Sequence, residues 1–337
     1  MVQVFDEGIY DIVEEALLGR GLTPKQTEAL YAVPETSREA ALIRWAGQEL
    51  SMRASQGVAE VHAQIGLNSS PCPKDCGFCS FAVSSKGRTG KVELSRHDVV
   101  EYAKEYEDQG ANLILLLTTA SYSFEKLVGM AAAVREAISP SLPLLVNTDD
   151  MTLQQCLQLK EAGVNGAYHA VRMGEGVDTS IPVETRMNTL EALDKAGMSL
   201  STCVEPIGPE HTPAQLAEAT FRCIQANPVS GGAGKRVAVP GTRLAVKPAH
   251  TELANANFAA IYRLATGVSL RLNCSANTPL TAASGANLAW AEVGSNPRDN
   301  VAKTENGGRG SSIERVRKMF LNTGWQVLDG PSQGWMR

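Results

Sequence analysis

Three cysteines, Cys72, Cys76 and Cys79, lie within eight residues of the sequence in the spacing C-x3-C-x2-C. Pro73 and Gly77 interrupt this stretch, and both residue types favour a loop that can turn all three sulfurs toward one centre. Three thiolates suit an iron–sulfur cluster in which one iron has no protein ligand. The sequence therefore predicts a metal centre in this loop, with the three cysteines as its ligands.

A structural zinc ion is the first alternative, but such a site usually has a fourth Cys or His close by. The next histidine, His97, lies in a helical pattern, and the next cysteine is Cys156. A disulfide framework is disfavoured because the loop is short and the total of seven cysteines is odd. An iron–sulfur cluster is the favoured interpretation, while zinc or three bystander thiols stay open.

The composition indicates a cytoplasmic protein with a sizeable hydrophobic core. The chain has 337 residues, 43% of them hydrophobic, which fits one large α/β barrel or two ordinary domains. Its net charge of −5 gives no basic surface for nucleic acid. The N-terminus lacks the basic flank of a signal peptide, and the longest apolar run, 113–117, is too short to cross a bilayer. We therefore expect no nucleic-acid partner and no membrane association.

Hydrophobic periodicity predicts helices in the first part of the chain and alternating strands and helices after Glu60. The early helices are expected at Val4–Leu18, Pro24–Ala32 and Ser37–Arg53. The predicted strands are Val61–Gly66, Asn112–Leu117, Pro143–Asn147, Gly166–Arg172, Ser199–Glu205, Arg236–Val239, Ser269–Asn273 and Ala286–Glu292. The helices predicted between them are Ser95–Gln109, Phe124–Ile138, Thr152–Ala162, Val183–Ala196, Thr212–Ala226 and Glu252–Ala265.

This alternation, without an obvious linker, favours a (β/α)8 TIM-type barrel, with an open parallel sheet as the second choice. We expect a helical N-terminal extension over 1–58, the barrel over 59–325 and a C-terminal tail over 326–337. The glycine-rich stretch 230–234 is interpreted as a flexible connector before the strand at 236–239, because it lacks the context of a phosphate-binding loop.

In such a barrel the C-terminal ends of the strands meet at one mouth, where active sites form. The cysteine loop follows the first predicted strand and is therefore expected at that mouth. Polar residues near the ends of the other strands should join it. They are Thr118, Thr119, Ser121, Asn147, Asp149, Asp150, His169, Arg172, Glu175, Cys203, Glu205, Glu210, His211, Arg243, Asn273, Cys274, Asn287, Glu292 and Arg298.

With Phe78 directly before its third cysteine, the loop resembles the signature of the radical S-adenosylmethionine (SAM) superfamily. The resemblance implies that Cys72, Cys76 and Cys79 bind a [4Fe–4S] cluster whose free iron binds SAM, and that Phe78 lies against the adenine. Enzymes of this kind reduce SAM to a 5′-deoxyadenosyl radical, which abstracts hydrogen from a small-molecule substrate. The resemblance also implies a flavodoxin- or ferredoxin-type reductant as partner.

The same resemblance gives candidate roles to residues at other strand ends. The residues expected to contact SAM are Phe78, Thr118, Thr119, Ser121, Arg172, Arg186 and Glu205. The hydroxyl residues fit an ordinary turn equally well, and each arginine is either a ligand of the SAM carboxylate or a solvated surface residue. Glu205 and His169 are the candidate catalytic residues.

Beyond the loop, residues 40–325 resemble the biotin synthase-like branch of the superfamily. That branch includes biotin synthase, a hydrogenase maturase, methylornithine synthase and proteins of the guanylylpyridinol cofactor pathway. The segments that carry the resemblance are Thr189–Gly197, Val239–Ala245 and Ser284–Leu288.

The chain departs from biotin synthase in its cysteines. Biotin synthase holds a sulfur-donating cluster with cysteines on strands two, three and five, whereas here only Cys203 lies on a corresponding strand. Cys203 and Cys274 leave an auxiliary iron–sulfur cluster open. The expected function is therefore hydrogen abstraction from a small molecule in the biosynthesis of a cofactor or metabolite. The alternatives are a sulfur-inserting enzyme of the biotin or lipoyl synthase type and a non-catalytic iron–sulfur or zinc protein.

Overall fold

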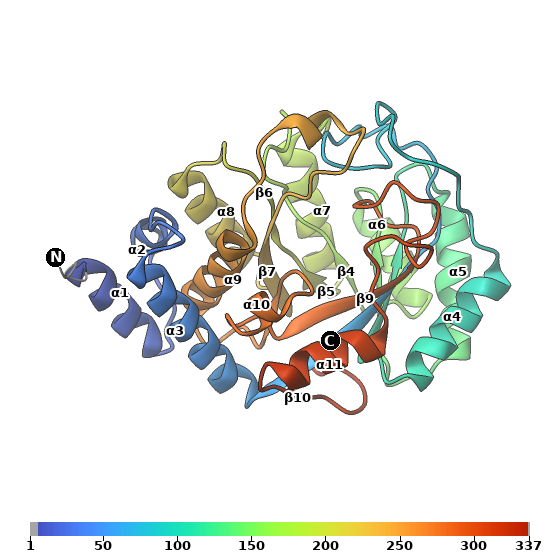
Figure 1. Ribbon diagram of the computed structural model, residues 1–337. Helices are drawn as coiled ribbons and strands as arrows, with labels where there is room; N and C mark the ends of the chain where they lie inside the picture. Colours follow the sequence, from blue (N-terminus) through green and yellow to red (C-terminus); the bar gives the residue numbers. More distant parts are fainter. Residues whose placement is uncertain (1–5, 336–337) are drawn as a thin grey trace.

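The computed structural model describes residues 6–335, in which helices surround a parallel barrel (Figure 1). The helices are α1 (Glu7–Leu17), α2 (Pro24–Tyr31), α3 (Arg38–Ser55), α4 (Arg96–Asp108), α5 (Phe124–Ala137), α6 (Leu153–Glu161), α7 (Val183–Lys195), α8 (Pro213–Gln225), η1 (Arg243–Val246), α9 (Glu252–Thr266), α10 (Pro279–Ala282) and α11 (Ile313–Asn322). The strands are β1 (Val58–Gly66), β2 (Leu113–Leu117), β3 (Leu144–Asn147), β4 (Gly166–Tyr168), β5 (Ser199–Ser201), β6 (Val204–Ile207), β7 (Ser230–Lys235), β8 (Leu272–Cys274), β9 (Leu288–Gly294) and β10 (Gln326–Val327).

Within the described residues, eight strands close the barrel. They follow one another in parallel pairs in the order β1, β2, β3, β4, β5, β7, β8 and β9, and β9 pairs with β1. The expected (β/α)8 TIM-type barrel is therefore confirmed, and the open sheet is excluded. Of the remaining strands, β6 pairs with β7 and β10 pairs with the start of β1.

Side chains along β1 point alternately toward the surrounding helices and toward the lumen of the barrel. The odd-numbered residues from 59 to 65 belong to the hydrophobic cluster that also contains residues of the surrounding helices. Glu60, His62 and Gln64 alternate with them and therefore face the lumen. The other strands alternate in the same way, so every second residue of each strand faces the interior of the barrel.

The helix boundaries follow from local capping. Ser95 with Asp98 begins α4, and Thr152 with Gln155 begins α6, each as a reciprocal capping box. Shortly after α4, α6 and α7, the chain has a glycine with a positive φ, which lets the backbone leave the helix without a steric clash. These signals lie within a few residues of sequence, so the helices start and end close to where the sequence predicts.

One strand lies where the sequence analysis expects a connector. Residues 230–234 belong to β7, and the strand predicted at 236–239 is wrong. A β-carbon at Gly231 would lie only 2.1 Å from the hydroxyl oxygen of Tyr262 on α9. Glycine therefore allows α9 to pack directly against this strand, and that tertiary contact outweighs the low strand propensity of glycine.

Two residues expected at the mouth lie elsewhere. Asn273 is inside β8, and its side-chain amide donates to the carbonyl oxygen of Ala259 on α9 at 3.0 Å. Asn287 precedes β9 and donates to the carbonyl oxygen of Val58 at the start of β1, at a distance of 3.2 Å. Asn273 therefore points outward to a helix, and Asn287 lies at the opposite end of the barrel.

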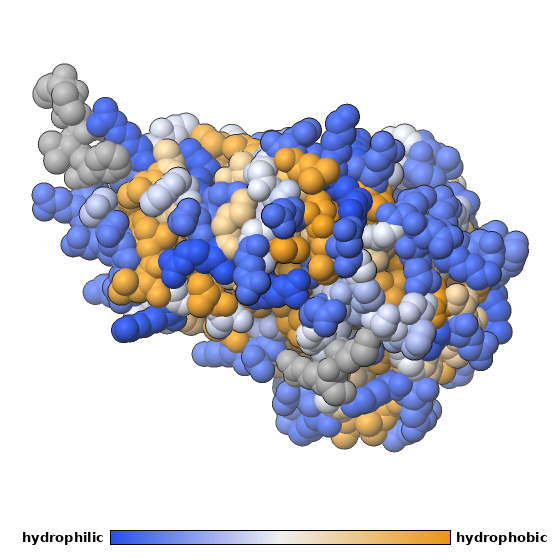
Figure 2. All heavy atoms as spheres, turned by 90° about the horizontal axis from the view of Figure 1, so that it is seen from below, coloured by the Kyte–Doolittle hydropathy of each residue, from blue (hydrophilic) through white to orange (hydrophobic). Residues whose placement is uncertain are grey.

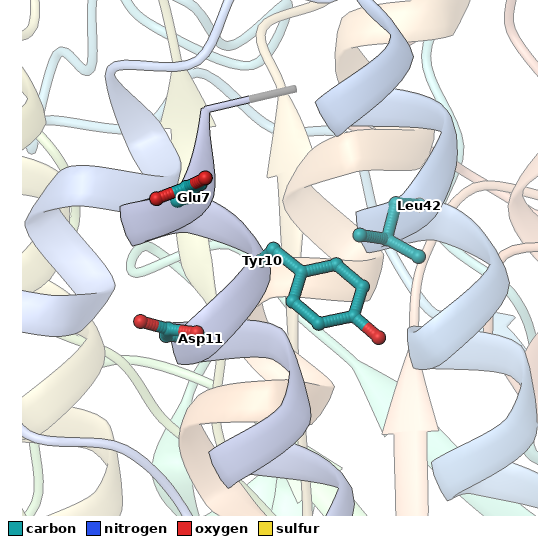
Figure 3. Close-up of a pocket in the computed structure, with 4 residues that line it drawn as sticks. All are labelled: Glu7, Tyr10, Asp11 and Leu42. Carbon is teal, nitrogen blue, oxygen red and sulfur yellow. The ribbon is translucent and has the colours of Figure 1, made fainter. Parts of the chain in front are cut away.

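The helices α1, α2 and α3 pack on the outside of the barrel against α8 and α9 (Figure 1). Helix α9 is consequently enclosed, and every residue from 254 to 266 is buried. A surface hollow between α1 and α3 is lined by Glu7, Tyr10, Asp11 and Leu42 (Figure 3). Viewed from below, the molecular surface shows several groups of hydrophobic residues between hydrophilic regions (Figure 2).

The C-terminal residues close the floor of the barrel, the end where the strands begin. The carbonyl oxygen of Trp335 accepts a hydrogen bond from the Ser199 hydroxyl at 3.0 Å. The Trp335 side chain is buried, and its ring centroid lies 6.0 Å from that of His62. Beside them the buried Glu60 carboxylate contacts His62 Nε2 at 3.0 Å and Arg271 Nη2 at 2.6 Å. The floor is thus filled by the ion pairs of Glu60 and by aromatic rings, while the buried His62 Nδ1 has no hydrogen-bond partner among the described residues.

Candidate active site at the barrel mouth

The cysteine loop leaves the end of β1 and lies across the mouth of the barrel, near the top in Figure 1. The Gly77 amide donates to the carbonyl oxygen of Asp178 at 2.7 Å, and the Leu244 amide donates to the carbonyl oxygen of Gly77 at 2.8 Å. The Ser80 amide donates to the carbonyl oxygen of Pro297 at 2.9 Å. Backbone hydrogen bonds to the loops after β4, β7 and β9 therefore set the position of the cysteines.

Arg88 adds a side-chain link between the cysteine loop and the segment after β9. Its Nη1 atom donates to Ser80 Oγ at 3.1 Å and to the carbonyl oxygen of Asp299 at 3.0 Å. Its guanidinium lies 4.6 Å from the ring centroid of Phe81, a cation–π contact. These contacts fix the C-terminal side of the loop.

The three thiols have surroundings suited to metal ligation. Burial raises the pKa of Cys76 to about 11 and the pKa of Cys79 to about 12, so both sulfurs hold their protons until a metal replaces them. The Phe81 amide already donates to the Cys79 sulfur at 3.4 Å. Hydrogen bonds to the sulfurs are one of the means by which proteins tune iron–sulfur clusters.

The spacing of the sulfurs separates a cluster from a single ion. Among the described residues, only Asp178, Glu210 and His211 bring ligand atoms all within 4.8 Å of one another, so the three cysteine sulfurs are spread more widely. Thiolates on one tetrahedral zinc ion would lie about 3.8 Å apart, given Zn–S bonds of about 2.3 Å. The wider spread fits a cluster of several irons better than a zinc ion.

The hydroxyl residues after β2 are engaged in hydrogen bonds at the base of the loop. Thr119 Oγ1 accepts from the side-chain amide of Asn68 at 2.9 Å, and Ser121 Oγ donates to the carbonyl oxygen of Pro71 at 3.0 Å. Thr118 Oγ1 lies 2.7 Å from the hydroxyl of Thr148. Thr119 and Ser121 thus support the cysteine loop, and contact of these residues with SAM stays a prediction.

Arg172 and Glu205 come together at the mouth, as the strand-end argument expects. Arg172 Nη1 lies 3.6 Å from Glu205 Oε1 and, although buried, has no hydrogen-bond partner among the described residues. The Tyr168 hydroxyl donates to the same carboxylate oxygen. Burial and the neighbouring Glu205 raise the pKa of Tyr168 well above its usual value, so the phenol keeps its proton. The Glu205 carboxylate therefore accepts a hydrogen bond from Tyr168 and forms an ion pair with Arg172, whose Nη1 approaches it without a hydrogen bond.

Arg186 and His169 belong to a network of charges behind this pair. Arg186 donates from Nη1 to Asp150 at 3.1 Å and from Nε to Glu175 at 3.2 Å. Asp150 also lies 3.5 Å from His169 Nε2 and 3.5 Å from Lys74 Nζ in the cysteine loop. Burial, aided by Arg186, lowers the pKa of His169 to about 3, so its ring is neutral at physiological pH. Arg186 therefore contacts two carboxylates. Through Asp150, the network connects helix α7 to Lys74 in the cysteine loop.

Sequence reasoning missed Tyr168, Lys74 and Arg88. Strand parity could have found Tyr168, since it shares the lumen face of β4 with Gly166. No local pattern indicates the other two, because their partners lie far away in the sequence. Phe78 is partly exposed between two of the cysteines, and its contact with adenine stays a prediction.

Cys203 and Cys274 approach each other across β7. Ser201 pairs with Ser230 and Cys274 pairs with Gly232, so Cys203 stands at the level of Gly232 on the other side of the strand. A hydrogen bond with Cys274, together with burial, holds the pKa of Cys203 well above its usual value. Among the described residues, no set of three ligand atoms within 4.8 Å of one another includes them. An auxiliary cluster at this pair stays a prediction.

Comparison with known proteins agrees with the fold and the loop. The family model described as "Radical SAM superfamily" matches residues 70–222, a range that includes the three cysteines, Arg172 and Glu205. Over those residues the chain is similar to the radical SAM superfamily, and the curated proteins that it resembles include biotin synthases.

The biotin synthase of Mycobacterium avium (strain 104) is 27% identical over 228 residues, which are 63% of each chain. The match therefore spans less than two thirds of that relative. Among solved structures, methylornithine synthase (PylB) has a TM-score of 0.71 at 15% identity, covering 83% of this chain and 85% of its own. The FeFe-hydrogenase maturase HydG from Carboxydothermus hydrogenoformans has a TM-score of 0.75 at 15% identity, covering 95% and 79%. At such identities the structures establish the barrel fold alone. None of the helices in the described residues has the length and apolarity to cross a bilayer.

Proposed function

We propose that this chain binds a [4Fe–4S] cluster through Cys72, Cys76 and Cys79 and cleaves SAM reductively. When bound, the cluster and SAM supply a 5′-deoxyadenosyl radical. The proposed reaction is hydrogen abstraction from a small molecule held in the lumen, in the biosynthesis of a cofactor or metabolite. A flavodoxin- or ferredoxin-type protein is the proposed reductant.

The observation that carries this proposal is the fixed position of the three cysteines over the open end of the barrel. The loop is hydrogen-bonded to three other mouth loops, and the sequence has no further cysteine or histidine between Cys79 and His97. A site with three protein ligands leaves a coordination position for another molecule. Gln64, Tyr168 and Glu205 in the lumen below are partly exposed, and we propose that the substrate binds there.

The charges around the loop also support the proposal. Three thiolates outweigh the charge of an oxidised four-iron core, so a loaded site is negative overall. The positive charge of Arg172 acts on both Cys76 and Cys79 and favours their thiolate forms. Its Nη1 lies 3.6 Å from Glu205 but forms no hydrogen bond among the described residues, so it is the proposed donor to the carboxylate of SAM. Arg186, with carboxylates on two of its nitrogens, is the weaker of the two candidates.

Glu205 is the proposed catalytic residue. Its side chain is 33% exposed, and Tyr168 and Arg172 both approach one carboxylate oxygen, Oε1. The second oxygen is thus available to orient a substrate or a ribose hydroxyl. His169 is neutral and faces Asp150, so we infer that it acts as a positioning residue in the network that supports the loop.

The test is anaerobic reconstitution of the full chain with iron and sulfide, followed by addition of SAM and dithionite. We expect about four irons per chain, as the cluster type requires, and formation of 5′-deoxyadenosine and methionine in equal amounts. A colourless preparation without iron, or an iron-loaded one that leaves SAM intact, would contradict the proposal.

A sulfur-inserting enzyme is the second candidate, because the match to biotin synthase favours it. Such an enzyme needs an auxiliary cluster, and Cys203 with Cys274 is the pair that could begin one. Iron and sulfide contents well above one [4Fe–4S] cluster per chain, with conversion of dethiobiotin, would favour this candidate. Contents of a single cluster would exclude it.

A further inference from the structure

Three of the four most exposed large hydrophobic side chains in the described residues lie in the loops around the cysteines. They are Val83, Val177 and Val246, which are 63%, 84% and 90% exposed, and we call them the valine patch. Val83 follows the third cysteine, Val177 lies between β4 and α7, and Val246 ends η1 after β7. Exposed hydrophobic side chains that gather on one surface mark sites of contact with other proteins.

Direct contacts bring the three loops of the valine patch together. Arg243, the first residue of η1, donates from Nη2 to the carbonyl oxygen of Asp75 at 2.8 Å and to that of Asp178 at 3.1 Å. Asp178 directly follows the valine of the β4 loop. The Asp75 carboxylate accepts from the amide of Ser84 at 2.9 Å, and Ser84 directly follows the valine of the cysteine loop. Arg243 therefore joins all three loops that carry the valine patch.

Basic residues border the valine patch. Residues 83–92 and 236–250 contain no Asp or Glu, although the chain as a whole has 36 acidic and 31 basic residues. The Lys86 amide donates to the carbonyl oxygen of Gly241 at 3.0 Å, so the two segments lie side by side near the top of Figure 1. Lys86 and Lys91 are exposed, as is Arg243, and we call these three residues the basic rim.

The carboxylates nearest to the basic rim are engaged with other lysines. Glu93 lies 2.7 Å from Lys126 Nζ. Asp178 and Glu210 lie 3.7 Å and 3.3 Å from Lys247 Nζ. These ion pairs leave the charges of the two rim lysines uncancelled, so the surface beside the cysteines is positive on a chain with a net charge of −5. A partner that fits this surface is acidic.

We propose that the valine patch and the basic rim form the docking surface for a small acidic flavin protein of the flavodoxin type. This inference rests on the proposed function and assigns the surface through which its electron arrives. The rim attracts the carboxylates of the partner, and the valines cover the apolar edge of its flavin ring. One electron then passes from the reduced flavin to the oxidised cluster, so the flavin loses the electron that the cluster gains.

Binding is measured by titration calorimetry of the full chain with an oxidised, negatively charged flavodoxin, without SAM. Replacing both rim lysines, Lys86→Glu with Lys91→Glu, should raise the Kd about 10-fold or more at low salt, because two attractions become repulsions. Added salt should weaken binding of the unchanged chain, since exposed charges are screened. The matched control is Lys25→Glu with Lys318→Glu, at exposed lysines of α2 and α11, and its Kd should stay unchanged. Equal weakening in both pairs would overturn the docking surface.

The apolar contact is tested without a change of charge. Val177→Ser combined with Val246→Ser should raise the Kd about 10-fold, because two hydrophobic side chains are no longer buried by the partner. Leu321→Ser, at a 60% exposed position of α11, is the control and should bind as the unchanged chain does. An unchanged Kd in the double valine variant would overturn the role of the valine patch. A ferredoxin of similar charge should bind more weakly, and equal binding by it would reject the flavin contact.

Two reductants separate this inference from the proposed function. With NADPH, a flavodoxin reductase and flavodoxin, SAM cleavage by the reconstituted variant Lys86→Glu with Lys91→Glu should fall about 10-fold at flavodoxin concentrations below the Kd. Dithionite is small and needs no docking surface, so the same variant should cleave SAM with it at the unchanged rate. Cleavage that is unaffected with both reductants would retain the proposed function and reject the docking surface. Flavodoxin binding that depends on the rim, in a chain that never cleaves SAM, would retain the docking surface and reject the proposed function.

Discussion

The two ends of the barrel are built from the same strands but differ in how their charged groups are paired. At the floor, the Glu60 carboxylate is paired with both His62 and Arg271, and Trp335 seals it from solvent. At the mouth, within residues 6–335, Arg172 Nη1 forms no hydrogen bond and the Cys76 thiol contacts only the carbonyl oxygen of Lys74, at 4.0 Å. The floor therefore contributes packing, whereas the mouth has hydrogen-bond donors and thiols that can bind other molecules.

This difference shows how a barrel separates stability from reactivity. A buried polar group without a partner costs about 1–3 kcal/mol, so unsatisfied groups at the mouth must be offset elsewhere. The floor residues and the enclosed helix α9 supply that offset through buried apolar surface and paired charges. Substitutions at the mouth should therefore reduce function with little loss of stability, and substitutions at the floor should do the reverse.

The largest expected effect comes from removing a ligand at the mouth. Cys76→Ala should abolish iron binding and SAM cleavage, while the free energy of unfolding of the metal-free chain changes by less than about 1 kcal/mol. Iron content, deoxyadenosine yield and far-UV circular dichroism measure the three quantities. Cys156→Ala, at a buried thiol of α6, should leave iron content unchanged. Reductive SAM cleavage by Cys76→Ala would show that the ligand assignment is wrong.

The floor should respond in the opposite way. Trp335→Ala should lower the free energy of unfolding by about 3–5 kcal/mol, because a fully buried indole leaves a cavity. Urea unfolding measures the loss, and iron content per folded chain should not change. The control is Trp45→Ala, since Trp45 is 54% exposed and should cost little. If both substitutions lowered the free energy of unfolding equally, Trp335 would contribute no more to stability than an exposed tryptophan.

The pH dependence of stability sharpens the comparison at the mouth. Because burial lowers the pKa of His169 from 6.5 to about 3, the unfolded chain binds a proton that the native chain does not. This contribution to stability is complete above about pH 6.5 and declines as the pH falls toward 3. His169→Gln should reduce the stability difference between pH 7 and pH 5 by about 2 kcal/mol.

Urea unfolding at the two pH values measures this change. His97→Gln on the exposed face of α4 is the control, and its pH dependence should match that of the unchanged chain. A His169→Gln variant with the original slope would mean that His169 titrates normally in the native protein.

The smallest expected effect concerns the base of the cysteine loop. Thr119→Val removes the hydroxyl that accepts from Asn68 and should weaken the anchoring by about 1 kcal/mol, which corresponds to roughly fivefold faster iron release to a chelator. Thr323→Val, at the end of α11, removes a hydroxyl far along the chain from the loop and should leave the rate of release unchanged. If Thr119→Val and the unchanged chain released iron at the same rate, the position of the cysteine loop would depend on its backbone hydrogen bonds alone.

The sequence predicts the helices and the barrel well because their signals are local. Capping residues such as Ser95 and Thr152, with glycines at the helix ends, define boundaries within one or two turns. The cysteine spacing likewise identifies the metal loop, because three thiols in a Pro- and Gly-bearing stretch have few other uses. The strand ends then place Arg172 and Glu205 near one another.

What the sequence does not predict depends on distant partners. β7 is missed because its glycines make sense only beside Tyr262 of α9. Asn273 and Asn287 are misplaced because a polar residue near a strand end can point outward or mark the start of the strand instead of its end. The links from Lys74 to Asp149 and Asp150, and from Arg88 to Asp299, join residues separated by dozens of positions. No local pattern contains them.

The glycines of β7 also leave open space in the lumen. Gly231 and Ala233 face α9, so Gly234 faces the lumen, and a β-carbon added there would meet no atom within 4 Å. A single alanine or serine at this position would narrow the space for a guest molecule while strand pairing persists. A single substitution at residue 234 would therefore change the size of molecule that the lumen accepts and leave the barrel fold unchanged.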